Sequence, residues 1–339
     1  DNLDVNGLNP GNWDVLATLA TGRVAEIIGN STHVWITPID DLQSEFGSAV
    51  LEGQRLPNGT IEWTRAWDFK SLIINELTLD GDTLWITTAG LGLVTINLST
   101  GVFSFTGAPL HYQMDEMAWY GNELVVGLMG TGGTAAGVQR YDTTTRTWGA
   151  GRLAAGLPSN IVLDFERIAN RVYIATLFGI GVWNLTADDW EDPITTADGL
   201  PTPFITHLDS DNGVLIIGTP SGLMSYDPGG QVLGQMFGRN QGLVGDSVSG
   251  IAKITDPTTG QTTLFVSHNG EGPTRPGFSE VLLTTTTVVI PGGVSTSLAF
   301  SVQDTTLIDV LPSNRITALA SDWWGVHIAT DSEPLMHWN

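Results

Sequence analysis

Residues 199–228, GLPTPFITHLDSDNGVLIIGTPSGLMSYDP, decide the fold of this 339-residue chain. They hold a Gly-Leu-Pro turn and then three short apolar stretches, which are separated by Asn-Gly and Pro-Ser turn residues. Asn-Gly between apolar runs is a strong hairpin signal. The stretch therefore predicts successive antiparallel strands, and no window of the chain shows the 3.6-residue periodicity of a helix.

The same pattern repeats along the chain. Gly-Leu turns begin at residues 156, 199 and 242, in steps of 43 residues. Seven apolar strands end in a small residue or Thr, or in one copy His: Ile36-Thr37, Ile86-Thr87-Thr88, Val126-Gly127, Ile174-Ala175-Thr176, Ile217-Gly218-Thr219, Val266-Ser267-His268 and Ile328-Ala329-Thr330. Most of their intervals are near the roughly 40–50 residues of a four-stranded propeller blade. Seven marks predict seven blades.

The two ends of the chain make up one of these blades. The residues after Ile328, taken together with those before Ile36, amount to one ordinary repeat. We expect residues 315–339 to supply three strands of the last blade and residues 1–21, near Trp13, to supply the fourth, which removes an exposed sheet edge. The predicted fold is all-β: residues 1–339 form a single seven-bladed β-propeller of four-stranded antiparallel blades, closed by the N-terminal strand.

A further mark predicts the hairpin between the two outer strands of a blade. An Asn or Asp is followed six positions later by a large apolar residue, as in Asn97 to Phe103, Asp142 to Trp148, Asn184 to Trp190 and Asp227 to Leu233. Asn and Asp side chains accept hydrogen bonds from the backbone just after them and tolerate left-handed conformations. This spacing therefore predicts a short turn between two strands.

At residues 199–228 the chain resembles the two-component regulator propeller repeat. The matching segments are the Gly199 turn, the strand from Ile205, the strand ending in Ile217-Gly218-Thr219 and the strand ending in Tyr226-Asp227. The resemblance extends more loosely over nearly the whole chain. It implies an extracytoplasmic ligand-binding propeller, so we expect an extracellular or cell-surface location, with the periplasm as the alternative.

The composition excludes several kinds of partner. Lys and Arg total 13 against 36 Asp and Glu, which gives a formal net charge of −23. Such a chain repels phosphate backbones and anionic lipids, so we expect no nucleic acid partner and no membrane insertion. The absence of cysteine excludes disulfides and thiolate metal sites. Other copies of the chain, neighbouring surface proteins and glycans remain as partners.

Long loops on one face of the predicted propeller form a candidate binding rim. Loops between strands are the usual place for binding residues. The rim residues are Asp40, Asp41, Glu45, His268, Glu271, Arg275, Asp331 and Glu333. A mixed polar rim of this kind would hold a sugar or a cation; the alternative is that these side chains are simply solvated loop tips.

Local signatures of catalysis are missing. The chain has no nucleophile elbow and no His-Glu-x-x-His motif, and its six histidines are scattered. We therefore expect no enzyme activity, no catalytic residues, no metal and no cofactor, with a weak Ca²⁺ signal at Asp209 and Asp211 as the exception. Two alternatives stay open: a polysaccharide-active hydrolase or lyase with carboxylates at the channel, and a periplasmic sensor domain of a larger receptor.

The remaining features concern the surface. Asn-x-Ser/Thr sequons that would accept N-linked glycans lie at Asn30, Asn58, Asn97 and Asn184.

The insertion 276–306 contains an uncharged β-branched run, which predicts either a hairpin folded on its own blade or a contact between copies. The candidate contact residues are Val281, Leu283, Val288 and Ile290, with the hairpin-tip pair Trp323 and Trp324. The predicted function is thus a non-enzymatic surface module, with sites for N-linked glycans, for binding or for self-assembly, for example into a filament.

Overall fold

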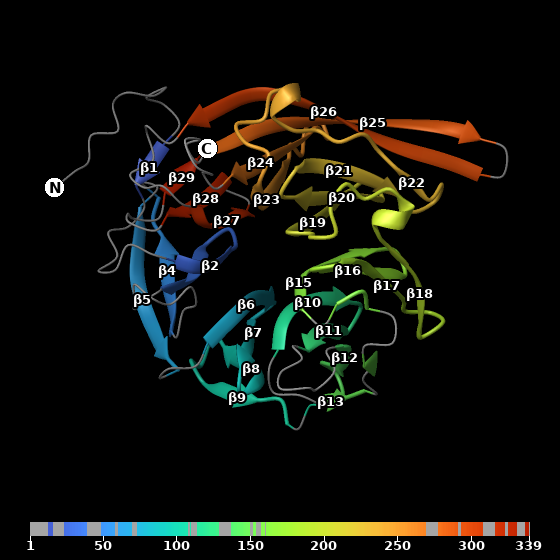
Figure 1. Ribbon diagram of the computed structural model, residues 1–339. Helices are drawn as coiled ribbons and strands as arrows, with labels where there is room; N and C mark the ends of the chain where they lie inside the picture. The colour runs from blue at the N-terminus through green and yellow to red at the C-terminus, as the bar shows by residue number, and fades with distance from the viewer. Residues whose placement is uncertain are drawn as a thin grey trace. The chain divides into compact units, whose positions relative to one another are not determined.

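Strands dominate the computed structural model of the chain (Figure 1). The structure describes residues 13–15, 24–38, 49–57, 60–69, 73–107, 109, 114–128, 137–149, 152–153, 157–159, 161–268, 277–290, 293–307, 316–322, 325–330 and 336–338. In these residues the strands form seven antiparallel sheets, six of four strands and one of five. The all-β prediction is confirmed.

The sheets are antiparallel meanders in which nearly all successive strands lie side by side. The first sheet holds β2 (Val24–Gly29), β3 (His33–Pro38), β4 (Ala49–Arg55) and β5 (Ile61–Asp68). The second holds β6 (Ile73–Asp80), β7 (Thr83–Ala89), β8 (Gly92–Asn97) and β9 (Phe103–Phe105). The third holds β10 (Met114–Tyr120), β11 (Glu123–Leu128), β12 (Gly137–Asp142), β13 (Thr147–Trp148) and β14 (Arg152–Leu153). Two more hold β15 (Val162–Ile168), β16 (Arg171–Thr176), β17 (Gly179–Asn184) and β18 (Asp189–Ile194); and β19 (His207–Asp211), β20 (Val214–Thr219), β21 (Gly222–Asp227) and β22 (Val232–Leu233).

The sixth sheet is enlarged by a long hairpin. It holds β23 (Val248–Thr255), β24 (Thr262–His268), β25 (Gly277–Ile290) and β26 (Gly293–Leu307). Figure 1 shows β25 and β26 as a pair of long strands. The insertion therefore forms the extended hairpin on its own sheet that was one of the two predictions for it.

The seventh sheet combines the two ends of the chain. It holds β27 (Ile316–Asp322), β28 (Gly325–Thr330) and β29 (Met336–Trp338), and β1 (Trp13–Val15) pairs antiparallel with β29 so that Trp13 lies opposite Trp338. This is the pairing that the spacing of the repeats predicts. Because β1 occupies the outer side of β29, the described part of this sheet has the same four-strand order as its neighbours in sequence.

The chain divides into two compact units. One contains residues 1–71, 238–284 and 300–339, and the other contains residues 72–237 and 285–299. In the first unit β23 contacts β27 and β27 contacts β2; in the second, β6 contacts β10, β10 contacts β15 and β15 contacts β19. Within each unit the sheets therefore follow one another through their first strands.

Two local structural features explain why Thr and Gly recur at the same positions of the repeat. Thr176 and Thr219 end their strands, and each hydroxyl donates to the carbonyl oxygen of the glycine three residues later, at 2.8 and 2.9 Å. That glycine is left-handed in both copies: Gly179 has φ 130 and Gly222 has φ 130. A Cβ at Gly222 would lie 2.4 Å from a backbone oxygen, so only glycine fits.

The Gly-Leu turns contain short helices that the sequence does not predict. A 3-10 helix at Thr196–Asp198 precedes Gly199, and a second one at Arg239–Gln241 precedes Gly242. Both glycines are left-handed helix caps, and the leucine after each is buried. Propensity over three residues is too weak a signal to have shown these turns of helix.

Side chains on the first strands connect neighbouring sheets of the second unit. Asp164 on β15 accepts a hydrogen bond from the backbone nitrogen of Leu208 on β19 at 2.7 Å. Glu76 on β6 accepts one from the backbone nitrogen of Met117 on β10. Each of these bonds joins the first strands of two neighbouring sheets, and so fixes one sheet against the next.

The far end of the long hairpin is fixed to sheet β19–β22. The Asp227 carboxylate accepts from the Ser295 hydroxyl at 2.8 Å and from the Thr296 backbone nitrogen at 3.0 Å. The Asn212 amide donates to the Thr285 hydroxyl at 3.0 Å. All of these residues belong to the same compact unit, so the hairpin packs on this chain's own structure.

Candidate functional site

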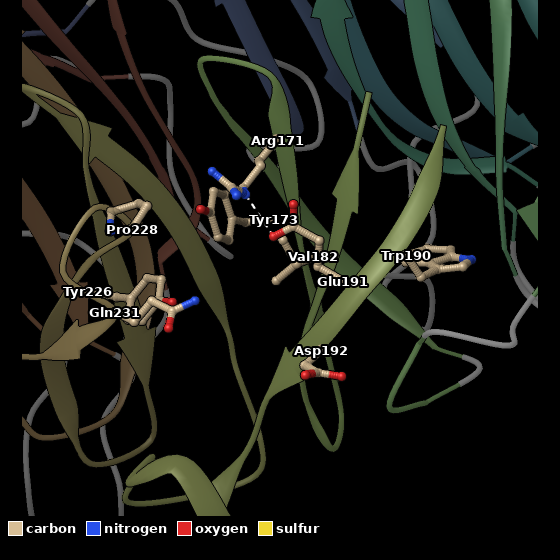
Figure 2. A pocket seen from close by; sticks show the side chains of 9 residues that line it. All are labelled: Arg171, Tyr173, Val182, Trp190, Glu191, Asp192, Tyr226, Pro228 and Gln231. Atoms are coloured by element: carbon tan, nitrogen blue, oxygen red, sulfur yellow. Dashed lines mark hydrogen bonds and ion pairs between the residues drawn. The ribbon is translucent and has the colours of Figure 1, made fainter. Parts of the chain in front are cut away.

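An open groove separates sheet β15–β18 from sheet β19–β22 (Figure 2). We call it the Arg171 groove, and its volume is about 400 Å³. The lining residues are Arg171, Tyr173, Val182, Trp190, Glu191, Asp192, Tyr226, Pro228 and Gln231. The first six come from β16, β17 and β18, and the last three from β21 and the turn that follows it.

A fixed ion pair lies inside this groove. Arg171 Nε donates to Glu191 Oε2 at 2.7 Å, and the Asn184 amide donates to Glu191 Oε1 at 2.7 Å. The Arg171 hydrogen bond lowers the pKa of Glu191 below its usual value, and the same bond raises the pKa of Arg171. Both groups therefore stay charged near neutral pH, with the carboxylate held in one orientation.

Aromatic rings provide the apolar part of the groove. The rings of Tyr173 and Tyr226 lie 6.2 Å apart at 65°, one from each sheet, and Trp190 packs against Trp183 at 6.0 Å. Burial raises the pKa of both tyrosines, so their hydroxyls stay protonated. Neither hydroxyl has a hydrogen-bond partner among the residues that the structure describes, and both line the groove. They are free to bond a ligand.

A second groove lies between sheet β6–β9 and the sheet of β10–β14. We call it the Arg146 groove, and its volume is about 260 Å³. The lining residues are Asp80, Thr83, Trp85, Thr95, Asn97, Val102, Ser104, Phe105, Thr106, Tyr141, Thr143 and Arg146. Its walls carry more hydroxyl groups than those of the Arg171 groove, and one arginine.

The two grooves are built from the same repeat positions. In the strand registers, Trp85 pairs with Thr95 as Tyr173 pairs with Val182. In both cases a large aromatic residue on the second strand lies opposite a small residue on the third. The small partner leaves the space that forms the groove.

At the interface between these two sites the equivalent groove is filled. There Val125 pairs with Arg140, so the aromatic residue is replaced by valine and the small partner by arginine. Arg140 donates to Glu123 at 3.1 Å and to Asp188 at 3.0 Å, and its guanidinium lies 5.4 Å from the centre of the Trp183 ring. The arginine side chain thus occupies the position that is open on either side.

We predict that Arg140→Thr opens this third groove and lowers the free energy of unfolding by about 1–2 kcal/mol. The substitution removes two charge-assisted hydrogen bonds and a cation–π contact at a site that is only partly exposed. Urea denaturation followed by circular dichroism measures the loss. The matched control is Arg146→Thr, because Arg146 forms no hydrogen bond or ion pair in the described part of the chain. An equal cost for both variants would contradict the prediction.

Most of the predicted binding rim lies outside the described residues. This applies to Asp40, Asp41, Glu45, Glu271, Arg275, Asp331 and Glu333. The exception, His268, is 1% exposed at the end of β24, so its placement on an exposed loop is wrong. Its Nε2 lies 3.3 Å from the Ser279 hydroxyl, and burial lowers its pKa to about 4. His268 is thus a neutral interior residue.

The candidate contact residues of the insertion also need correction. Val281 and Leu283 are 0% and 3% exposed, because alternate side chains of β25 face the interior of the sheet packing. They cannot form an exposed contact. The side chains of Val288 and Ile290, and both Trp323 and Trp324, lie outside what the structure describes.

Of the four sequon asparagines, Asn30 lies in a turn, Asn97 and Asn184 are the last residues of β8 and β17, directly before a turn, and Asn58 lies outside the described residues. Asn30, Asn97 and Asn184 each accept backbone hydrogen bonds from residues two or three positions later. The amide nitrogens of Asn97 and Asn184 donate to Asp82 and to Glu191. Each of these three asparagines therefore has a structural role in its turn, whether or not it carries a glycan.

The residues with the weak calcium signal lie on β19. Asp209 and Asp211 precede the Asn212-Gly213 turn, in which both residues have positive φ. In the described part of the chain, no group of three or more His, Asp or Glu side chains could hold a metal ion.

The sequence did not show the grooves. Arg171, Tyr173, Glu191 and Tyr226 are 55 residues apart at most, but they belong to two different repeats. The signal that could have found them is the pairing of a large and a small residue at matching positions of β16 and β17, compared across all repeats.

Comparison with known proteins gives matches in structure only. No family description and no curated protein matches the sequence. The extracellular domain of the putative hybrid two component system BT4673 from B. thetaiotaomicron aligns with a TM-score of 0.63 and 17% identity, over 96% of this chain and 39% of that chain. The likeness is one of fold. This chain spans about two fifths of the length of that domain.

Two further structures give the same result. The extracellular domain described as that of the putative one component system BT4673, from the same organism, aligns with a TM-score of 0.61 and 16% identity over 97% of this chain and 40% of that chain. The computationally designed Ika8 protein aligns with a TM-score of 0.59 and 10% identity over 95% of this chain and 98% of that chain.

None of the described residues forms a helix with the length and apolarity needed to cross a membrane.

Proposed function

We propose that the chain is an extracellular, non-enzymatic ligand-binding module, and that the Arg171 groove holds a small, neutral, polyhydroxylated ligand such as a mono- or disaccharide. The observation that carries the proposal is the unused hydrogen-bonding capacity of this groove. The hydroxyls of Tyr173 and Tyr226 have no partner among the described residues, and they lie between aromatic surfaces. Sites for small ligands combine apolar walls with a few convergent polar groups in this way.

The charges of the groove favour a neutral ligand. Arg171 and Glu191 already neutralise each other at 2.7 Å, and the remaining charged side chain of the lining, Asp192, disfavours an anion. The Arg171 guanidinium and the Glu191 carboxylate are held in place by their own hydrogen bonds. Each of them can still form a hydrogen bond with a hydroxyl group of an uncharged ligand. Fold similarity to two extracellular domains supports a location outside the cytoplasm.

The same geometry argues against catalysis in this groove. A carboxylic acid that protonates a glycosidic oxygen needs a raised pKa. The pKa of Glu191 is lowered by its hydrogen bond from Arg171. We therefore propose binding without chemistry, in place of the polysaccharide-active alternative.

Titration calorimetry with glucose, maltose, cellobiose and N-acetylglucosamine tests this function. We expect at least one of these sugars to bind, and Tyr226→Phe or Arg171→Gln to weaken its binding about tenfold, since each removes a groove donor. Arg146→Gln, in the other groove, is the matched control and should leave the affinity unchanged. Absence of binding at 10 mM, on the order of the weakest useful affinity, or equal affinity in all variants, contradicts the proposal.

We further propose that the seven sheets are the blades of a closed seven-bladed β-propeller and that the module is the sensing part of a larger receptor. Sequential contacts between first strands within each unit support the first point. The likeness in fold to the extracellular domains of the BT4673 systems supports the second. A native full-length protein without any further domain would contradict the receptor role.

Self-assembly through the long hairpin is a second proposed function. The outermost strand of its sheet, β26, has 15 residues, which is long for an edge strand. Such an edge can add a strand from another copy. Light scattering at high protein concentration tests this: a strictly monomeric chain would contradict assembly, while glycan occupancy at the four sequons is read from the same sample by mass spectrometry.

A further inference from the structure

Trp85 has an unpaired hydrogen-bond donor in the wall of the Arg146 groove. The residue is 7% exposed, and its indole Nε1 is buried without a hydrogen-bond partner in the described part of the chain. Neighbouring tryptophans are satisfied: Trp119 Nε1 donates to Thr78 at 3.1 Å and Trp148 Nε1 donates to Thr106 at 3.0 Å. A buried indole N–H normally has an acceptor.

Two other tryptophans share this lack of a partner, but not its location. Trp63 and Trp183 also have a buried Nε1 without a partner among the described residues. Neither of them lines the Arg146 groove or the Arg171 groove. Of these three tryptophans, only Trp85 lines one of the two grooves.

Arg146 supplies a second donor to the same groove. It is exposed, it has a left-handed backbone with φ 58, and it forms no hydrogen bond or ion pair with the described residues. Arg140 and Arg171, which line or fill the equivalent sites, both have carboxylate partners. In a chain with 13 basic and 36 acidic residues, a free guanidinium beside a cavity is unusual.

We propose that the Arg146 groove is a second ligand site, and that it binds the carboxylate form of a single sugar acid. The guanidinium of Arg146 pairs with the ligand carboxylate, and Trp85 Nε1 donates to a ligand oxygen. The volume of about 260 Å³ is at the small end of ligand pockets, which suits one sugar ring. Guanidinium and carboxylate match in geometry as well as in charge.

The remaining walls select a sugar acid over a simple aliphatic acid. Tyr141 and Phe105 supply ring surface for the body of a sugar, and Thr83 supplies a hydroxyl. Asp80 lines the groove at its exposed edge and accepts hydrogen bonds only, so it needs a ligand hydroxyl. An aliphatic acid has no such hydroxyl to offer.

Titration calorimetry of the whole chain with D-glucuronate and with D-glucose tests this site. We expect glucuronate to bind at least tenfold more tightly through the Arg146 groove, and Arg146→Gln to remove that preference. Trp85→Phe keeps the ring but not the donor, and should weaken glucuronate about tenfold. Arg171→Gln is the matched control and should leave glucuronate binding unchanged, and the melting of each variant by circular dichroism verifies folding.

Three results would overturn the proposal: no glucuronate binding, equal affinity for glucuronate and glucose, or full glucuronate affinity in folded Arg146→Gln. None of them bears on the Arg171 groove, whose neutral ligand responds to Tyr226→Phe. The two proposals therefore fail separately. Binding of glucuronate that is lost in Arg171→Gln but kept in Arg146→Gln would place the sugar acid in the wrong groove and also refutes the inference.

Discussion

Replacing Trp183 with alanine is expected to lower the free energy of unfolding by about 3–5 kcal/mol. Trp183 is 0% exposed and belongs to a buried cluster with Val125, Phe165 and Ile174. Its ring also carries the Arg140 guanidinium at 5.4 Å. Alanine would leave a cavity between two sheets, and the rigid backbone of paired strands cannot collapse to fill it.

Urea denaturation followed by far-ultraviolet circular dichroism measures this loss, since strand content reports on folding without interference from the other tryptophans. The control is Phe103→Ala, because Phe103 is an aromatic residue of an outer strand that is 51% exposed. We expect that control to change stability by less than about 1 kcal/mol. A similar small change in Trp183→Ala would show that the interface between these two sheets does not depend on this side chain.

The contribution of two buried histidines to the free energy of unfolding is expected to fall by about 3 kcal/mol each between pH 6.5 and pH 4, at a slope of up to about 1.4 kcal/mol per pH unit for each histidine. Burial lowers the pKa of both His268 and His207 to about 4. The unfolded chain takes up a proton at each site near pH 6.5, and the folded chain does so only near pH 4. Stability from these groups is therefore complete above pH 6.5 and is lost as the pH falls.

Unfolding midpoints in urea at half-unit pH steps measure this slope. His268→Gln should reduce it, and the double variant with His207→Gln should reduce it further. The Ser279 hydroxyl, which lies 3.3 Å from His268, can bond the glutamine amide, so the single variant should fold. An unchanged slope in the double variant would mean that other groups cause the acid sensitivity.

Asp164 is expected to oppose the two histidines over the same pH range. Burial raises its pKa to about 8, against the effect of hydrogen bonds from the backbone nitrogens of Leu208 and Phe165. Because its folded pKa lies above the unfolded value of about 4, its contribution is complete only below about pH 4 and is lost as the pH rises from there through 8. Asp115, whose pKa burial raises to about 6, acts in the same direction. The total slope between pH 4 and 6.5 is therefore a difference between opposing groups, and the histidine contribution is read from the change of slope in His268→Gln and in the double variant.

Hairpins were predictable from the sequence because each depends on residues that are close in the chain. The residue six positions after the turn Asn or Asp pairs with the residue just before it: Trp190 lies opposite Trp183, and Leu233 lies opposite Tyr226. The turn between them is fixed by side-chain oxygens, such as that of Asn184, that bond the next backbone nitrogens. These are local rules, so single residues carry the signal.

The grooves were not predictable because they depend on relative size across a pair of strands. Val182 and Arg140 occupy the same strand position, yet one leaves a cavity and the other fills it. Whether the position leaves a cavity depends on the residue that pairs with it, which is Tyr173 for Val182 and Val125 for Arg140. The error at Val281 and Leu283 has a related cause: an apolar run shows that a strand is buried on some side, but not which side.

The left-handed residue four positions after each turn Asn or Asp has a practical consequence. It is Arg146, Asp188 or Gln231 in three successive copies, with φ between 50 and 58, and in each copy its side chain reaches a groove or fills one. Substitution there leaves the strand registers untouched, because the residue belongs to no strand. Directed evolution that is confined to these three codons should therefore diversify recognition while the scaffold stays intact.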